Sequence, residues 1–209
     1  MMISKDLVIK TARKIIELFP RRHSDTDPFK VLISTVLSQR TRDENTEVST
    51  KELFSKFKSP WELSKADPHD IYHLIRAAGM YRQKAQRIIK ISKILVKEYD
   101  GRVPSNLSDL LKLPGVGRKT ANIVLFVGFG IPALAVDTHV HRISNRLGWI
   151  KTTTPEATEK ELTKILPKDL WGPINGSMVE FGRKICKPIN PFCQKCPVSE
   201  FCEYFKEKR

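Results

Sequence analysis

The segment LPGVGRKTANIVL, residues 113 to 125, places a lysine where a lysine can do chemistry. Lys119 follows two glycines and an arginine and stands at the start of an apolar run with helical spacing. An ammonium in the first turn of a helix faces the positive end of the backbone dipole, which is unfavourable. The position is therefore either tolerated or used, and a neutral amine held there would be a nucleophile.

The glycines before this lysine suit a tight turn between two helices, with backbone N–H groups exposed at the start of the second helix. Such amides bind a phosphate without reading any base. A nucleotide-binding P-loop would need an earlier glycine and a preceding strand, and the segment has neither. The plain alternative is an interhelical turn with a solvated arginine and lysine. The candidate phosphate-contacting residues are Gly115, Val116, Gly117 and Arg118.

All four cysteines fall in one C-terminal segment with the spacing C-x6-C-x2-C-x5-C, at Cys186, Cys193, Cys196 and Cys202. We expect the four thiolates to share a metal, because a reducing compartment disfavours disulfides. Zinc and a 4Fe–4S cluster both accept four cysteines, and a lone C-x2-C pair cannot choose between them. Zinc sites usually combine two pairs of cysteines that are each separated by two to four residues, whereas this segment has one such pair.

The composition is strongly basic, with 37 Lys or Arg against 23 Asp or Glu in 209 residues, a net charge of +14 and a pI near 9.7. This balance is typical of nucleic-acid-binding proteins, with membrane surfaces a second possibility. No stretch is long and apolar enough for a membrane span, and the first 20 residues lack the apolar core of a signal peptide. We expect an intracellular protein.

Apolar residues recur at spacings of three and four, which predicts an all-α fold. A capping residue followed by proline marks four helix starts, at Asp27-Pro28, Ser59-Pro60, Asp67-Pro68 and Thr154-Pro155. A helix is predicted from Arg82 to Tyr99, and its inner face is Ala85, Ile88, Ser92, Leu95 and Tyr99. Gly79 ends the helix before it, and a short helix from Ser105 to Leu113 leads into the glycine turn.

LPGVGRKTANIVL resembles the helix-hairpin-helix of the endonuclease III family of DNA glycosylase/AP lyases, and AVDTHVHRISNRLG resembles the loop and aspartate that complete the family's motif. The resemblance covers nearly the whole chain. It implies the helix-hairpin-helix-GPD glycosylase fold, all-α, with two helical lobes and a C-terminal iron–sulfur cluster loop. The expected domains are a helical bundle at residues 22–132, with the hairpin at about 105–127, and a cluster domain of residues 1–21 plus 133–209.

The resemblance implies that Lys119 is the nucleophile and Asp137 its partner. A neutral amine can attack C1′ of deoxyribose, displace a damaged base and form a Schiff base that permits β-elimination of the 3′ phosphate. Desolvation, Arg118 and the helix N-terminus would lower the lysine pKa as this attack requires. Asp137 would stabilise the cationic sugar and handle protons. By its position alone, Asp137 is more often a helix N-cap.

The cysteine spacing matches the family's cluster loop, so the resemblance favours a 4Fe–4S cluster over zinc. Lys187 and Lys195 stand beside the ligands and would present a basic loop to the DNA backbone. A structural staple for the C-terminal segment is compatible with that role.

Two further segments resemble parts of the family that enter the duplex. The segment VLISTVLSQRTRDENT, residues 31 to 46, resembles the family's L-S-x-Q-x-x-D pattern but departs from it at the glutamine. Gln39 lies one position too early, and Arg40 occupies the position of the glutamine. Either residue could fill the space of an extruded base, and a polar helix end is the plain alternative. Met80 replaces a more usual leucine as the wedge between bases. His139 would orient the aspartate motif or contact the backbone.

The resemblance thus implies a bifunctional glycosylase/AP lyase of base excision repair that removes oxidised pyrimidines and cleaves the strand 3′ to the abasic site. Its partner would be double-stranded DNA with damaged pyrimidines or abasic sites, without a membrane, and the protein would be a cytoplasmic, nucleoid-associated monomer. The alternatives are a mismatch or adenine glycosylase of the same superfamily and a non-catalytic, structure-specific DNA-binding module. Relatives of the first kind generally lack the lysine, and the pair of Lys119 and Asp137 argues against the second.

Overall fold

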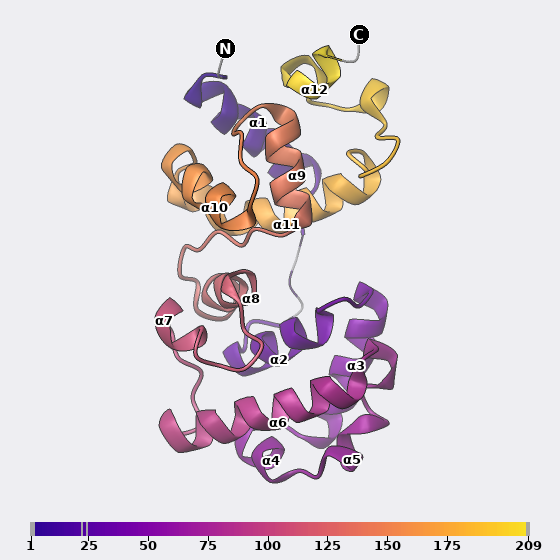
Figure 1. The fold of residues 1–209 in the computed structure, drawn as a ribbon, viewed down its shortest axis with the longest axis vertical. Helices are drawn as coiled ribbons and strands as arrows, with labels where there is room; N and C mark the ends of the chain where they lie inside the picture. Colours follow the sequence, from indigo (N-terminus) through magenta and orange to yellow (C-terminus); the bar gives the residue numbers. More distant parts are fainter. Residues whose placement is uncertain (1–2, 22, 24, 208–209) are drawn as a thin grey trace. The chain divides into compact units, whose positions relative to one another are not determined.

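A computed structural model of the chain describes residues 3–21, 23 and 25–207, and within these ranges the structure is helical and has no strand (Figure 1). The chain divides into two compact units, one formed by residues 1–23 and 132–209 (unit 1) and one by residues 24–131 (unit 2). The elements of unit 1 are α1 (Lys5–Leu18), α9 (Thr138–Leu147), α10 (Pro155–Ile165), α11 (Lys168–Lys184), η3 (Cys193–Lys195), η4 (Ser199–Phe201) and α12 (Glu203–Lys206). Those of unit 2 are α2 (Pro28–Ser38), α3 (Asp43–Lys56), α4 (Pro60–Lys65), α5 (Pro68–Tyr72), η1 (Arg76–Ala78), α6 (Tyr81–Glu98), α7 (Leu107–Leu110), α8 (Arg118–Ile123) and η2 (Val124–Gly128).

The four predicted helix starts are confirmed. In α2, α4, α5 and α10 the proline occupies the start of the helix, where its missing N–H costs no hydrogen bond. The preceding residue caps each helix, because its side-chain oxygen accepts a hydrogen bond from a backbone N–H of the first turn. The capping residues are Asp27, Ser59, Asp67 and Thr154.

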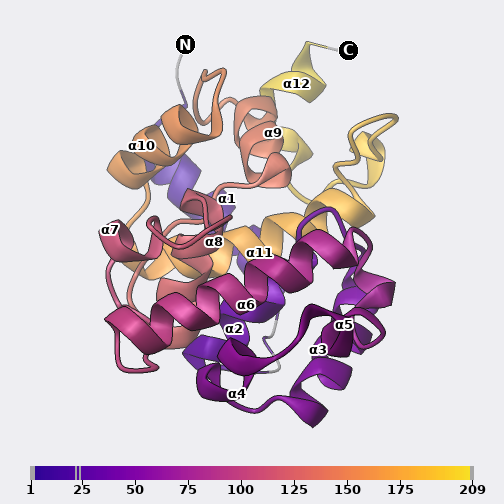
Figure 2. The same ribbon diagram turned by 60° about the horizontal axis from the view of Figure 1, so that its bottom comes forward.

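The long helix of unit 2, α6, follows the prediction closely and packs against α4 and α5 (Figure 2). Ala85, Ile88, Ser92 and Leu95 are buried as expected, whereas Tyr99 is the half-buried C-cap. The inner face also contains Lys84, which the sequence analysis does not place there.

The helix before the glycine turn is shorter than predicted. It begins at Leu107 rather than Ser105, because the Asn106 side chain accepts the hydrogen bond of the Asp109 N–H and caps the helix there. Regular α-helix ends at Leu110, so the hairpin joins two short helices.

The core of unit 1 joins the first helix of the chain to helices that begin 120 residues or more after it ends. Buried apolar side chains of α1 pack with those of α9, α10 and α11, and α1 lies against α11. Val8, Ala12 and Ile15 of α1 are 0–1% exposed, so this amphipathic helix buries the centre of its apolar stripe. In unit 2 the apolar helix α2 contributes the most continuous run of buried residues, from Val31 to Leu37 with one half-buried serine.

Candidate functional site

The glycine turn of unit 2 connects α7 to α8 and contains the predicted phosphate-contacting residues. Gly115 has a φ of +75°, a left-handed conformation that glycine adopts without strain. Buried Val116 anchors the turn, and its N–H donates to the carbonyl of Leu113 at 3.1 Å. Gly117 is the N-cap of α8 and has no side chain that could satisfy the first amides of the helix. Lys119 lies in the first turn of α8 and is half-buried.

Gln39 ties the end of α2 to this turn. Its Nε2 donates to the carbonyl of Gly115 at 2.9 Å, and its Oε1 accepts a hydrogen bond from Arg87 on α6 at 2.9 Å. The guanidinium of Arg87 lies so close to the turn that a Cβ at position 115 would collide with it. Both ends of the Gln39 amide are therefore engaged within unit 2. Sequence reasoning missed Arg87, because no motif contains it.

Arg40 and Met80 line an open cleft of about 270 Å³ in unit 2. The φ angles of Arg40 and Met80 are +53° and +45°, values that residues other than glycine seldom adopt and that concentrate at functional sites. Both side chains are exposed. The full lining of the cleft is Gln39, Arg40, Met80, Gln83, Lys84 and Arg87. Two segments predicted to enter a duplex thus meet at one cleft.

Lys84 also lines this cleft, although its side chain is almost wholly buried. Its Nζ donates to the carbonyls of Leu37 and Ala78 at 2.7 and 2.8 Å and to the Thr41 hydroxyl at 2.6 Å. Burial, and to a lesser degree the charge of Arg87, lowers the pKa of Lys84 to about 8. The sequence held a signal for it, because Lys84 precedes Ile88 by four residues and so falls on the apolar face of α6.

Asp137 of unit 1 is the N-cap of α9. Its Oδ1 accepts hydrogen bonds from the backbone N–H groups of His139 and Val140, both at 2.9 Å. Oδ2 makes no hydrogen bond to the residues that the structure describes. The side chain of Asn175 donates to the carbonyl of Ala135 at 2.9 Å and holds the segment before the cap against α11. The N-cap geometry therefore uses one carboxylate oxygen.

His139 is a neutral ring in the first turn of α9. Burial lowers its pKa, and this effect exceeds the opposing influence of Asp137. Arg142 can only donate, so the 3.2 Å contact between its NH2 and Nδ1 makes Nδ1 an acceptor and places the ring proton on Nε2. The ring packs against Gly182 of α11, where a Cβ would collide with Nδ1. The ring of His139 thus contacts both its own helix, at Arg142, and α11, at Gly182.

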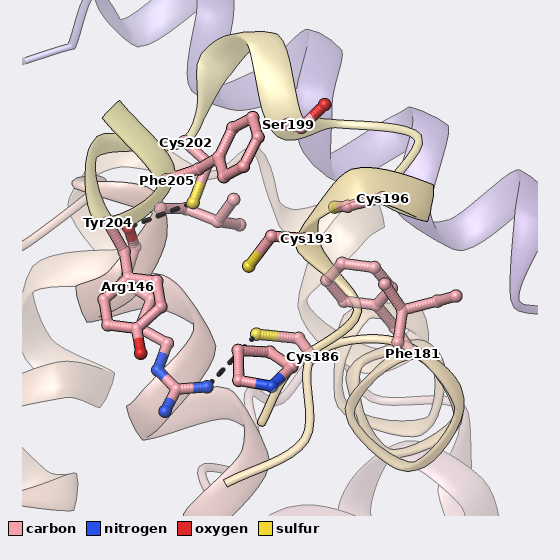
Figure 3. A pocket seen from close by; sticks show the side chains of 12 residues that line it. Arg146, Phe181, Cys186, Cys193, Cys196, Ser199, Cys202, Tyr204 and Phe205 are labelled. Atoms are coloured by element: carbon pink, nitrogen blue, oxygen red, sulfur yellow. Dashed lines mark hydrogen bonds between the residues drawn. The ribbon is translucent and has the colours of Figure 1, made fainter. Parts of the chain in front are cut away.

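The four cysteines line one small pocket of unit 1, with a volume of about 20 Å³. Figure 3 shows Cys186, Cys193, Cys196 and Cys202 on different sides of this space. The remaining walls are largely apolar, formed by Leu147, Phe181, Ile185, Pro191, Tyr204 and Phe205 with Arg146 and Ser199. Burial raises the pKa of Cys196 to about 11 and also raises that of Cys202. No three His, Cys, Asp or Glu residues of the described chain are grouped closely enough to bind a single metal ion.

Arg146, near the end of α9, holds the loop that contains these cysteines. Its NH1 lies 3.6 Å from the Sγ of Cys186 (Figure 3). The same NH1 donates to the carbonyl of Lys187 at 2.7 Å, and NH2 donates to the carbonyl of Pro188 at 2.7 Å. The guanidinium also lies over the ring of Tyr204, 4.6 Å from its centroid. Sequence reasoning missed Arg146 as well, because nothing in the spacing shows which helix packs against the cysteine loop.

The two predicted basic residues of this loop differ in their surroundings. The Nζ of Lys187 lies 4.4 Å from the centre of the Phe192 ring, a cation–π contact. Lys195, on η3, is exposed. None of the described helices is long and apolar enough to cross a membrane.

Comparisons with known proteins agree with this geometry. The model of the HhH-GPD superfamily of base excision DNA repair proteins matches residues 33–168. Endonuclease III of Thermotoga maritima is 66% identical over 97% of this chain and 95% of that protein, and endonuclease III of Bacillus subtilis is 40% identical over 90% and 88%. A solved structure of a trapped endonuclease III–DNA covalent intermediate, an estranged-adenine complex, is 39% identical and superposes with a TM-score of 0.91 over 99% of both chains. A thermostable thymine-DNA glycosylase, 26% identical, gives a TM-score of 0.89 over 97% of both chains.

The glycine turn and Asp137, the N-cap of α9, both lie within the matched residues, and the match defines a base excision DNA repair protein of the HhH-GPD superfamily. Within that superfamily the chain belongs to the endonuclease III family of DNA glycosylase/AP lyases. The interpretation as a non-catalytic DNA-binding module is therefore wrong.

Proposed function

We propose that this chain removes oxidised pyrimidines from double-stranded DNA and cleaves the strand 3′ to the resulting abasic site, with Lys119 as the nucleophile. The observation that carries the proposal is the presence of a lysine in the first turn of α8, directly after a glycine turn whose amides can bind a phosphate. Endonuclease III itself has been captured as a covalent intermediate with DNA, which agrees with chemistry through a nucleophilic residue.

The chemistry requires the amine of Lys119 in its neutral form. The nitrogen attacks C1′, and the base leaves with the electron pair of the glycosidic bond. The nitrogen, cationic after the attack, loses a proton, and its lone pair then expels the ring oxygen of the sugar, which takes up a proton, so that a Schiff base remains. The Schiff base acidifies the C2′ proton, and removal of that proton expels the 3′ phosphate. An amine is needed for this second step, because an activated water would stop at base removal.

Asp137 would supply negative charge to the cationic sugar. One oxygen is committed to the cap of α9, which fixes the carboxylate, and the second oxygen is left to face a cationic sugar or to accept a proton. Neutral His139 keeps α9 in place against α11 and does not compete for that charge. The N-cap and the catalytic roles of Asp137 are therefore compatible.

The cleft of unit 2 would contact the opened duplex. Arg40 is exposed there and has a planar guanidinium that can hydrogen-bond the base left without its partner, whereas Gln39 is occupied by Gly115 and Arg87. We therefore assign the gap-filling role to Arg40 and a tethering role to Gln39. Met80, 46% exposed, is the wedge between the neighbouring bases. Lys187 and Lys195 would add phosphate contacts.

We propose that the cysteine loop holds a 4Fe–4S cluster through Cys186, Cys193, Cys196 and Cys202. The donor set fits this group, because four thiolates line one largely apolar pocket and an Arg146 N–H lies beside the Sγ of Cys186. When bound, the cluster would cross-link the loop. The glycosylase and lyase steps need no electron transfer, so the loop residues serve to shape a basic surface.

Borohydride trapping on a duplex with a single abasic site tests the proposal, because only a Schiff base is reduced to a stable covalent complex. The wild-type protein should form this complex, and Lys119→Ala should lose it while retaining affinity for the duplex. Lys112→Ala is the matched control, since Lys112 belongs to the same hairpin and its ammonium bonds to Asp109 on the surface. An undiminished complex with Lys119→Ala would show that another amine is the nucleophile.

A further inference from the structure

Lys84 carries a buried charge that the proposed chemistry does not use. Its side chain is among the largest fully buried ones of the protein, at 2% exposure. An ammonium has three N–H donors, and here three acceptors each accept one hydrogen bond from the Lys84 Nζ, at distances of 2.6–2.8 Å. None of the three acceptors is an anion. Only dipoles therefore stabilise the charge. Burial still disfavours the charged form, and the pKa of Lys84 is lowered as a result.

The three acceptors belong to two different segments of unit 2. The Leu37 carbonyl lies in the last turn of α2, and the Ala78 carbonyl is at the end of η1, where carbonyl groups favour a cation. Thr41 follows α2, and its hydroxyl also contacts the carbonyl of Ala78. Lys84 and Thr41 thus connect the segment after α2 to the segment after η1.

Each connected segment contains one of the two strained residues of the cleft. Arg40 lies between Leu37 and Thr41, and Met80 follows Ala78 by two residues. A left-handed conformation in a residue with a side chain persists only where the surrounding structure holds it. We infer that Lys84 is a positioning residue, which fixes the spacing of Arg40 and Met80 so that both enter the duplex together. The inference rests on the proposed function, which places these two residues in the opened duplex.

The alternative is a lysine that only stabilises the fold. An apolar side chain at position 84 would fill the same space without the cost of a buried charge, but it could not bond both carbonyls. Such a side chain would preserve the packing of α6 and release the two segments from one another. Independent measurements of protein stability and of duplex opening therefore distinguish a positioning role of Lys84 from a purely stabilising one.

The test compares one lesion in two duplexes, a fully paired one and one in which a bulge has already unstacked the damaged nucleotide. Lys84→Met should weaken affinity and base release for the paired duplex by about 10- to 100-fold, the effect of losing hydrogen bonds to a charged group. The loss on the pre-opened duplex should be less than about threefold, because little unstacking remains to be done. Lys93→Met makes the same substitution on the exposed face of α6 and should leave both values unchanged.

Thr41 provides a second variant if Lys84→Met does not fold. Thr41→Val removes one acceptor from the network and should show the same preference for the pre-opened duplex, and Thr41→Ser should restore wild-type behaviour. Equal losses on the two duplexes, for Lys84→Met or for Thr41→Val, would overturn the inference. A wild-type protein that releases no base from either duplex would instead overturn the proposed function, and the affinities alone would then decide the role of Lys84.

Discussion

Gln39 and Arg40 are neighbours in the chain with opposite surroundings. The amide of Gln39 is held at both ends, by Arg87 and by the Gly115 carbonyl. Arg40 is exposed in the cleft and has a left-handed backbone conformation. A shift of one position in the family's motif has therefore placed an arginine where the glutamine is expected and given the glutamine a role inside the protein.

This difference predicts a selective effect for one residue and a general effect for the other. Arg40→Ala should lower affinity for a duplex with an oxidised pyrimidine by about 1–3 kcal/mol, the range for a good contact to a base edge, and leave affinity for intact DNA unchanged. Gln39→Ala should weaken both, because it frees the turn that binds phosphate. Affinities must be compared at one salt concentration, since the net charge of +14 makes each of them salt-dependent. The opposite pattern would show that Gln39 fills the gap.

The roles of individual residues were predictable only in part. Capping by Asp137 follows from its place before an apolar helix, because an N-cap is a local property. The tethering by Gln39 and the burial of Lys84 depend on segments that are 76 and 47 residues apart in the chain. No spacing rule contains those distances, so the register of the motif alone could not say whether Gln39 or Arg40 fills the gap.

At the scale of elements, the absence of a side chain at Gly117 leaves room beside the hairpin turn. Gly117 has a φ of −93°, which any residue can adopt. A Cβ added at this position would meet no heavy atom of the described residues within 4 Å. The space beside the turn is therefore available to a phosphate.

Gly117→Val should accordingly leave the thermal unfolding midpoint nearly unchanged and weaken binding to damaged and intact duplexes alike. Phosphate contacts hold the backbone without reading the base, so neither duplex should be spared. Gly117→Ala, with a smaller side chain, should give the same pattern with a smaller loss. Unchanged affinity of Gly117→Val for both duplexes would exclude the turn as a phosphate site.

Helix starts were the most predictable elements, because a capping side chain followed by proline is a local signal that packing does not override. The short helix before the hairpin was less so. Ser105 and Asn106 are both good caps, and only the structure shows that Asn106 accepts the hydrogen bond. The η2 segment could not be predicted at all, since a wider helical turn leaves no mark in the apolar spacing.

At the scale of the whole molecule, the proposed 4Fe–4S cluster predicts the colour and the metal content of the protein. We expect the purified protein to be brown and to contain iron and acid-labile sulfide in equal amounts, as a 4Fe–4S cluster requires. Metal and sulfide analysis of anaerobically prepared protein measures this directly. A colourless protein with one zinc per chain would refute the cluster and leave the glycosylase assignment unaffected.

The division of the chain between the two units has a consequence for its biosynthesis. Unit 2 is one continuous stretch, residues 24–131, so its core can close as soon as that stretch has left the ribosome. Unit 1 cannot do so, because the apolar stripe of α1 packs against α11, which begins 150 residues after α1 ends. Helix α1 must therefore wait, with Val8, Ala12 and Ile15 incompletely covered, until α11 emerges. Chaperone contacts with the nascent chain should concentrate on α1 during that interval.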